Sequence, residues 1–288
     1  MSEGYVDVPG GRVWYVIHGD GGEGIPLLCL HGGPGFPHDY LEELAQLADR
    51  RPVIFYDQLG CGRSDRPDDD SLWRVDRFVE ELAAVRTALG LDRLHLFGSS
   101  WGGMLAMQYV LDRKPQLESL ILASSPASMP RWAKECAELV AQLPDDARQE
   151  IERHEAEGWY GCPEYTAAVL LFDKRHVCRL DPWPPGLERA YAGVGMQVYT
   201  HMNGPTEFTV LGVLKEWDVT DRLGEISVPT LVASGEHDEL RPAHAEEIAR
   251  RIPDAELEIF PDASHLAFAE HPDSYRERVN EFLDRVEG

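Results

Sequence analysis

The sequence predicts an α/β fold with a mostly parallel, eight-stranded sheet that is covered by helices on both faces. Short apolar runs alternate with helical patterns along most of the chain, which is typical of parallel strands joined by helices. A hairpin precedes this alternation and makes the sheet mixed. A helical segment at 126–218 interrupts the alternation, and we expect it to lie over the carboxyl ends of the strands, where ligands bind in open α/β sheets.

Residues 1–125 are expected to form the first part of this core. Residues 5–8 and 12–19 flank a Pro-Gly-Gly turn and predict an antiparallel hairpin. The run at 25–32 is continuously apolar, as in a buried central strand. Further strands are predicted at 52–58, 93–98 and 117–124, and helices at 38–49, 75–89 and 101–113.

The segment 126–218 contains helical patterns without convincing strands, and it is rich in Trp, Tyr, His and Pro. We therefore expect a helical cap, inserted after the sixth strand. Strand and helix alternate again in 219–288, which is expected to complete the core. There the predicted strands begin at 228 and 255, and the predicted helices are 243–251 and 272–286.

The charge and cysteine content exclude several classes of protein. The formal net charge is −24, from 27 basic and 51 acidic residues, so nucleic acid and anionic membranes are not expected as partners. Five cysteines without CxxC spacing favour neither a disulfide framework nor a zinc site. The N-terminus has no signal-peptide pattern and no run reaches the ~20 apolar residues of a membrane span. We expect a soluble, cytoplasmic protein; its oligomeric state is not indicated.

Gly98-Ser99-Ser100-Trp101-Gly102 matches G-x-S-x-G between a predicted strand and a predicted helix, which is the context this motif requires. Small residues two positions before and after the nucleophile let the backbone turn sharply. Ser100 has glycine at both positions, whereas Ser99 would need glycine at 97 and 101. Ser100 is therefore the candidate nucleophile; the alternative is a serine that only caps the helix.

A serine hydroxyl needs a base that is oriented by a third group. After such a nucleophile the chain order is acid, then histidine. The loop after the strand that begins at 228 offers Glu236, Asp238 and Glu239, and the loop after the last strand offers His265. We predict Asp238 as the orienting acid and His265 as the base. Three other histidines are expected to be surface or packing residues: His237, His244 and His271.

An oxyanion requires preorganised backbone donors. We predict the N–H of Trp101, directly after the nucleophile, and the N–H of Gly33. Gly33 belongs to His31-Gly32-Gly33-Pro34-Gly35, which is similar to the HGGG-type loop. The alternative for this loop is a glycine-rich turn without a catalytic donor.

Together these motifs resemble the α/β-hydrolase family of proline iminopeptidases, which includes tricorn-interacting aminopeptidases and bacterial L-amino-acid amidases. The resemblance covers essentially the whole chain and implies an α/β-hydrolase fold with a helical cap. It rests on segments 30–41, 56–65, 98–106, 201–212, 215–223 and 235–240 with Ser264-His265; the cap segment 176–184 is particularly similar to the amidases. Ser99 stands where the family often has glycine, and the compact cap favours a broader specificity than proline alone.

The resemblance implies that Glu207 and Glu239 hold the free α-ammonium of the substrate. The physical chemistry agrees, because an ammonium in a partly dry pocket needs an opposing charge. Anchoring it would place the first carbonyl near Ser100. The alternatives are a surface cap residue for Glu207 and a helix-start charge for Glu239. Five cap aromatics line either a side-chain pocket or the cap's own core: Trp183, Tyr191, Tyr199, Phe208 and Trp217.

The predicted function is a serine hydrolase that acts, through an aminoacyl-enzyme, on N-terminal residues of short peptides or on amino-acid amides. No metal and no cofactor are expected. The alternative is a carboxylesterase with the same triad, for which Glu207 and Glu239 would have no use. A binding protein on the same scaffold would not need all of Ser100, Asp238 and His265.

Overall fold

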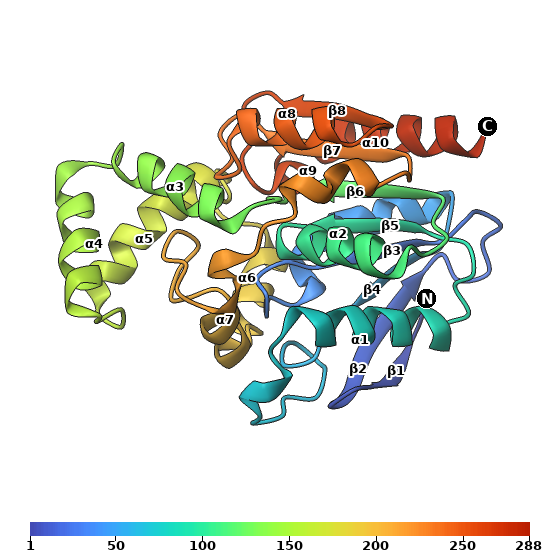
Figure 1. Ribbon diagram of the computed structural model, residues 1–288, viewed down its shortest axis with the longest axis horizontal. Coiled ribbons are helices and arrows are strands. Elements are labelled where there is room, and N and C mark those ends of the chain that lie inside the picture. The colour runs from blue at the N-terminus through green and yellow to red at the C-terminus, as the bar shows by residue number, and fades with distance from the viewer.

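The computed structural model describes residues 1–288 and contains one eight-stranded sheet (Figure 1). The strand order is β1-β2-β4-β3-β5-β6-β7-β8. Strand β2 runs antiparallel to β1 and β4, and every other pair of neighbours is parallel, so the predicted mixed sheet is confirmed. The strands are β1 Ser2–Val8, β2 Gly11–His18, β3 Leu27–Leu30, β4 Val53–Tyr56, β5 His95–Ser99, β6 Ser119–Ala123, β7 Thr230–Gly235 and β8 Ala255–Phe260.

The central strands are buried because helices cover both faces of the sheet. Every residue of β3 to β7 is buried. Alternate residues of a strand point to opposite faces, and in β3 Leu28 and Leu30 join one apolar cluster while Leu27 and Cys29 join the other. This explains why the run at 25–32 is continuously apolar and not alternating.

Three helices cover each face of the sheet. The apolar cluster that contains Leu28 and Leu30 includes α1 (Val75–Ala88), α2 (Trp101–Arg113) and α8 (Pro242–Arg251). The cluster on the opposite face, with Leu27 and Cys29, includes η1 (His38–Asp49), α9 (Ala267–Glu270) and α10 (Pro272–Glu287). Two short 3₁₀ segments are η2 (Asp70–Leu72) and η4 (Thr220–Glu225). None of the helices has the length and apolar composition that crossing a membrane requires.

The helix predicted at 38–49 forms with 3₁₀ geometry and not as an α-helix. Its buried leucines, Leu41, Leu44 and Leu47, are spaced three residues apart, which matches the three-residue turn of a 3₁₀-helix. The apolar face is therefore as predicted, although the winding is tighter.

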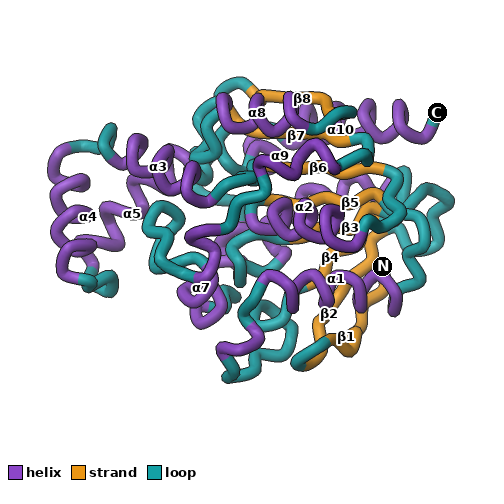
Figure 2. The backbone as a smooth tube through the Cα atoms, in the orientation of Figure 1, coloured by secondary structure: helices purple, strands orange, loops and turns teal.

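A helical cap follows β6, the sixth strand, as predicted. It contains α3 (Met129–Val140), α4 (Asp145–Glu157), α5 (Pro163–His176), α6 (Pro185–Ala192), α7 (Met196–Met202) and η3 (Val213–Glu216). Figure 2 shows helices and loops in this region but no strand. The two ends of the insert are paired, because Met129 N donates to Trp217 O (2.9 Å) and Val219 N donates to Ala127 O (2.9 Å). The chain thus leaves and re-enters the core at one place, beside the predicted limits 126 and 218.

Candidate active site

Ser100 occupies a sharp turn between β5 and α2. Its φ of 55° and ψ of −122° lie in a region that residues with a side chain rarely adopt. The turn is held by a hydrogen bond from Ser100 N to Ala123 O (2.8 Å). A Cβ added to Gly98 would collide with the backbone of Gly102, and one added to Gly102 would collide with Leu30 O. Both glycines are therefore required by the close approach of three backbone segments.

The two adjacent serines have different surroundings. Ser100 lines a cavity beneath the cap. Ser99 is completely buried, and its Oγ has no hydrogen-bond partner. Of the two serines, only Ser100 borders the cavity.

His265 and Asp238 lie side by side, with 2.8 Å between His265 Nδ1 and Asp238 Oδ1. Asp238 also accepts hydrogen bonds from Leu240 N and Ser234 Oγ, both at 2.8 Å, so its carboxylate is held from three directions. Burial lowers the pKa of His265, but the charge of Asp238 and its hydrogen bond outweigh burial, and the pKa rises above 6.5. Because a carboxylate only accepts, Nδ1 carries the proton and Nε2 is left as the base.

His265 and Ser100 border the same cavity, but no hydrogen bond joins His265 to Ser100 Oγ. Such bonds are often long before substrate binds. The other three histidines of these loops do not line the cavity. His237 is 40% exposed, His244 Nδ1 lies 3.0 Å from Glu135, and His271 caps α10.

The cavity is narrow, with a volume of about 40 Å³. It brings together five predicted residues from distant parts of the chain, namely Gly33, Ser100, Glu207, Glu239 and His265. Its remaining wall consists of Tyr191, one of the cap aromatics considered for a side-chain pocket, and of five residues that were not predicted: Phe36, Tyr40, Val177, Leu187 and Leu266. Phe36 and Tyr40 belong to the segment 30–41, whose resemblance to the family was a usable signal.

Two carboxyl groups face this cavity, Glu239 buried and Glu207 half-buried, and no lysine or arginine lines it. Glu239 is 0% exposed, and neither of its carboxylate oxygens has a hydrogen-bond partner. Burial raises the pKa of Glu239 well above its usual range, and the charges of Glu207 and Asp238 add to this effect. Glu207 accepts a hydrogen bond from Tyr199 Oη (2.8 Å), yet burial still raises its pKa. The pocket is thus acidic, and its one basic side chain is His265, whose Nδ1 lies 3.4 Å from Glu239 Oε1 and is hydrogen-bonded to Asp238.

A third buried acid, Asp173 of α5, was missed by the sequence reasoning. Its Oδ2 accepts a hydrogen bond of 3.4 Å from Tyr191 Oη, and Tyr191 lines the cavity. Burial and the charge of Glu207 raise the pKa of Asp173 to about 8. No motif marks this residue, since its closeness to Glu207 arises only from the packing of the cap.

The predicted oxyanion donors lie beside Ser100. Gly33 has a φ of 106°, which favours glycine, and its N–H donates to no protein acceptor. By contrast, Gly32 N donates to Tyr40 Oη (2.6 Å). Trp101 is the first residue of α2, so its N–H has no acceptor within the helix. Gly33 and Trp101 border a second small void together with Ser100.

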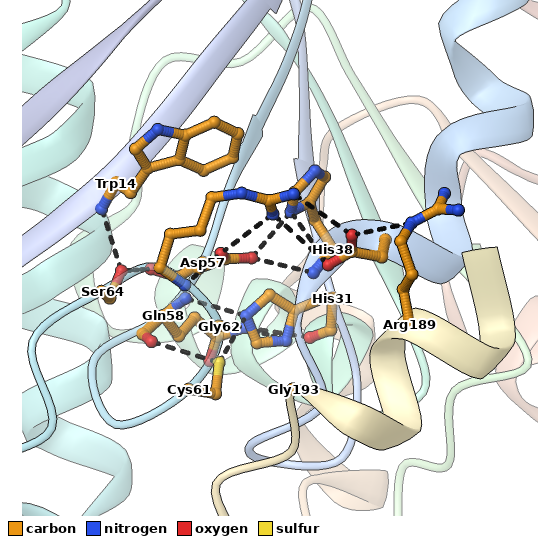
Figure 3. A network of polar contacts seen from close by, with 12 residues as sticks. Trp14, His31, His38, Asp57, Gln58, Cys61, Gly62, Ser64, Arg189 and Gly193 are labelled. Atoms are coloured by element: carbon orange, nitrogen blue, oxygen red, sulfur yellow. Dashed lines mark hydrogen bonds and ion pairs between the residues drawn. The ribbon is translucent and has the colours of Figure 1, made fainter. Parts of the chain in front are cut away.

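Gln58 connects the two donor segments. Trp101 Nε1 donates to Gln58 Oε1 (2.8 Å), and Gln58 Nε2 donates to His31 O (2.9 Å). Gln58 N donates to His31 Nε2 (2.8 Å), so His31 Nδ1 carries the proton and donates to Gly32 O (3.0 Å). Burial lowers the pKa of His31 to about 4, which keeps the ring neutral. Figure 3 shows His31 and Gln58 within this polar network.

Asp57 organises the same region (Figure 3). It accepts hydrogen bonds from His38 N (3.0 Å), His38 Nδ1 (2.7 Å) and Arg63 N (2.8 Å). Burial alone would raise the pKa of Asp57, but the hydrogen bond and charge of His38 prevail and lower it to about 2. Asp57 therefore stays ionised and ties the loop after β3 to the loop after β4.

The five cap aromatics divide between the two alternatives. Tyr191 lines the cavity, and the ring of Trp183 stacks on the ring of Tyr191 with 5.3 Å between centroids. Tyr199 donates a hydrogen bond to Glu207. Phe208 packs on Phe172 inside the cap, with 4.9 Å between ring centroids. Trp217 donates to Gln108 at the base of the cap.

Two groups of side chains bring metal-ligating atoms within 4.8 Å of one another, namely His38 with Asp39 and Glu42, and Glu236 with His237 and Asp262. In the first group, Asp39 already contacts Arg63 and Arg189, and His38 contacts Asp57. The second group is largely exposed. Neither group includes Ser100, Asp238 or His265.

Comparisons with known proteins agree with this geometry. The profile of the alpha/beta hydrolase fold family matches residues 25–272. The chain is 42% identical over 286 residues to a proline iminopeptidase of Heyndrickxia coagulans, and the match covers 99% of each protein. It is similar to the crystal structure of a Mycobacterium smegmatis proline iminopeptidase (40% identity, TM-score 0.91, 99% and 98% covered). It is also similar to the crystal structure of VinJ (38% identity, TM-score 0.96, 99% of each chain covered).

Proposed function

This chain belongs to the α/β-hydrolase fold family and, within it, to the proline iminopeptidases, and from that premise we propose that it removes the N-terminal residue of short peptides or hydrolyses amino-acid amides. The observation that carries the proposal is the Glu239 carboxylate, which is buried in the same cavity as Ser100 and His265 and accepts no hydrogen bond. The basic group that contacts it, His265 Nδ1 at 3.4 Å from Oε1, is already hydrogen-bonded to Asp238. An ionised carboxylate in such a place is costly unless a cation pairs with it. The α-ammonium of a substrate is that cation.

The anchored ammonium defines which bond is cleaved. Glu207 and Glu239 hold the amino group, and the carbonyl carbon of the same residue then lies two bonds from the nitrogen, towards Ser100. The cavity is small, about 40 Å³, and borders Glu207, Glu239 and Ser100, so the remainder of the peptide must extend beyond it. This restricts cleavage to the first peptide bond, by positioning as much as by chemistry.

The reaction follows from the groups at the site. His265 Nε2 accepts the proton of Ser100 Oγ, and Oγ attacks the carbonyl carbon. The N–H groups of Gly33 and Trp101 donate to the oxyanion of the tetrahedral intermediate. His265 then gives its proton to the leaving amine, which departs and leaves an aminoacyl ester on Ser100. A water molecule, deprotonated by His265, attacks this ester and releases the amino acid, while Asp238 stabilises the imidazolium throughout.

A substrate panel tests the proposal. Prolyl, alanyl and leucyl arylamides and amino-acid amides are compared with N-acetylated counterparts and with simple aryl esters. We expect turnover of the free-amino substrates and a loss of at least about 100-fold on acetylation, since a buried charge loses its partner. Equal turnover of blocked and free substrates would show that the carboxylates do not anchor an ammonium, and preference for the esters would favour a carboxylesterase.

Two serine variants test the nucleophile. Ser100→Ala is expected to abolish turnover, because the attacking atom is removed. Ser99→Ala serves as the matched control and is expected to retain activity, because Ser99 Oγ is buried and makes no hydrogen bond. Full activity of Ser100→Ala, or a loss confined to Ser99→Ala, would refute the assignment.

A further inference from the structure

The cap segment His176-Val177-Cys178-Arg179 begins at the last residue of α5 and lies against the loop that carries His265. His265 N donates to His176 O (3.0 Å), and Leu266 N donates to Val177 O (3.1 Å). Ser264 Oγ also donates to Val177 O (3.0 Å), and Arg179 Nη1 donates to Asp262 O (3.0 Å). The cap is therefore hydrogen-bonded to the backbone on both sides of the base.

The side chain of His176 reaches the second loop of the triad. Its Nδ1 lies 2.8 Å from the carbonyl oxygen of His237, which belongs to the same peptide group as the nitrogen of Asp238. A carbonyl oxygen only accepts, so His176 Nδ1 must carry a proton and donate. Burial lowers the pKa of His176, which keeps the ring in its neutral form. One cap residue thus binds the acid loop through its side chain and the base through its backbone.

We propose that His176 is a positioning residue, which sets the distance between Asp238 and His265 by holding both of their loops to the cap. The proposal rests on the proposed roles of Asp238 and His265. It assigns to the cap a part in the catalytic geometry in addition to its part in substrate binding, because Val177 of the same segment lines the cavity. No contact of His176 with the substrate is required.

The test uses a matched pair of variants. His176→Asn keeps an N–H close to the position of Nδ1, whereas His176→Leu has the same branched shape as Asn but no donor. The readout is the rate at which phenylmethanesulfonyl fluoride inactivates the protein, because this reagent sulfonylates an activated serine and does not need the ammonium anchor. The rate is measured as a function of pH, alongside kcat and KM for free-amino and N-acetylated arylamides.

We expect His176→Leu to react roughly 10- to 100-fold more slowly, since a displacement of about 1 Å in a catalytic group costs about 10²-fold. The acid limb of its pH profile is expected to move to lower pH, because a weaker contact with Asp238 lowers the pKa of His265. The loss is expected in kcat, with KM changing less, and His176→Asn is expected to stay within about threefold of the wild type.

Wild-type rates and an unmoved acid limb in His176→Leu would overturn the inference, and so would an equal loss in both variants. If His176→Leu does not fold, His176→Gln is used instead. The side-chain N–H of glutamine extends past the position of Nδ1, so the same loss in the inactivation rate is expected. A wild-type protein that reacts with the reagent but hydrolyses no free-amino substrate would refute the proposed function alone. Retained reactivity of His176→Leu would refute this inference alone.

Discussion

Replacing Glu239 by glutamine removes one negative charge from the cavity and preserves the shape of the side chain. The structure predicts opposite effects on activity and stability. In the free protein the carboxylate accepts no hydrogen bond, and the His265 Nδ1 that lies 3.4 Å away is already bound to Asp238, so ionised Glu239 opposes folding. In the complex it pairs with the substrate ammonium, so it promotes binding. Glu239→Gln should therefore give a more stable protein that handles free-amino substrates poorly.

The size of the activity loss follows from burial. Removing one partner of a buried charge pair costs roughly 2–5 kcal/mol. Glu207 remains in the variant and holds part of the ammonium, so a value near 3 kcal/mol is appropriate, which corresponds to about a 100-fold loss in kcat/KM. For N-acetylated arylamides and aryl esters, which carry no ammonium, kcat/KM should change little.

The sign of the stability change follows from proton linkage. The pKa of Glu239 is higher in the folded protein than in the unfolded chain, so the stability contributed by this group is present below its unfolded pKa and lost as pH rises through its folded pKa. Glutamine does not ionise, and the variant should be more stable at pH 8 by about 1–3 kcal/mol. This corresponds to a Tm higher by roughly 2–10 °C. At pH 4 the difference should largely vanish.

The assay combines kcat/KM on paired free and N-acetylated substrates with thermal unfolding at pH 4 and pH 8. Glu246→Gln, an exposed change of the same kind, is the control and should leave both quantities unchanged. An equal loss on free and blocked substrates would show that Glu239 acts on the triad and not on the ammonium. A lower Tm at pH 8 would show that the carboxylate has a partner in the free protein.

Three further outcomes test other parts of the site. The kcat/KM for an N-acetylated ester should rise with pH, with the midpoint of the rise above pH 6.5, because His265 acts as a base only when neutral and its pKa is raised. A midpoint below pH 6 would contradict this. Gly102→Ala should lower the free energy of unfolding by about 1–3 kcal/mol or more, because the new Cβ meets Leu30 O. The midpoint of urea unfolding should fall accordingly, and an unchanged midpoint would rule out the close approach. Asp57→Asn should cost about 2–3 kcal/mol at pH 7, worked from the lowering of the pKa of Asp57 from 3.8 to about 2. That stability is present above pH 3.8 and lost as pH falls towards 2, so wild type and variant should converge in acid; a gap that persists at pH 2 would argue for lost packing instead.

Much of the fold was predictable because its signals are local. The hairpin, the central strands and the helices that cover them follow from the period of apolar residues within each segment. The choice of Ser100 over Ser99 follows from the two glycines around it, and the structure places Ser100 in the cavity and Ser99 in the core. Local periodicity did not reveal that the segment 38–49 winds as a 3₁₀-helix, because leucines spaced by three suit both kinds of helix.

The sequence by itself therefore determined the α/β core, the place of the cap and the residues available for chemistry. Only the tertiary structure decided how those residues are surrounded. Asp238 and Glu239 are neighbours in the chain, yet Asp238 accepts hydrogen bonds from Ser234, Leu240 and His265, while Glu239 accepts none and only lies 3.4 Å from His265 Nδ1. The reason is physical: the state of a buried charge depends on the groups within a few ångströms, and residues far apart along the chain supply those groups here.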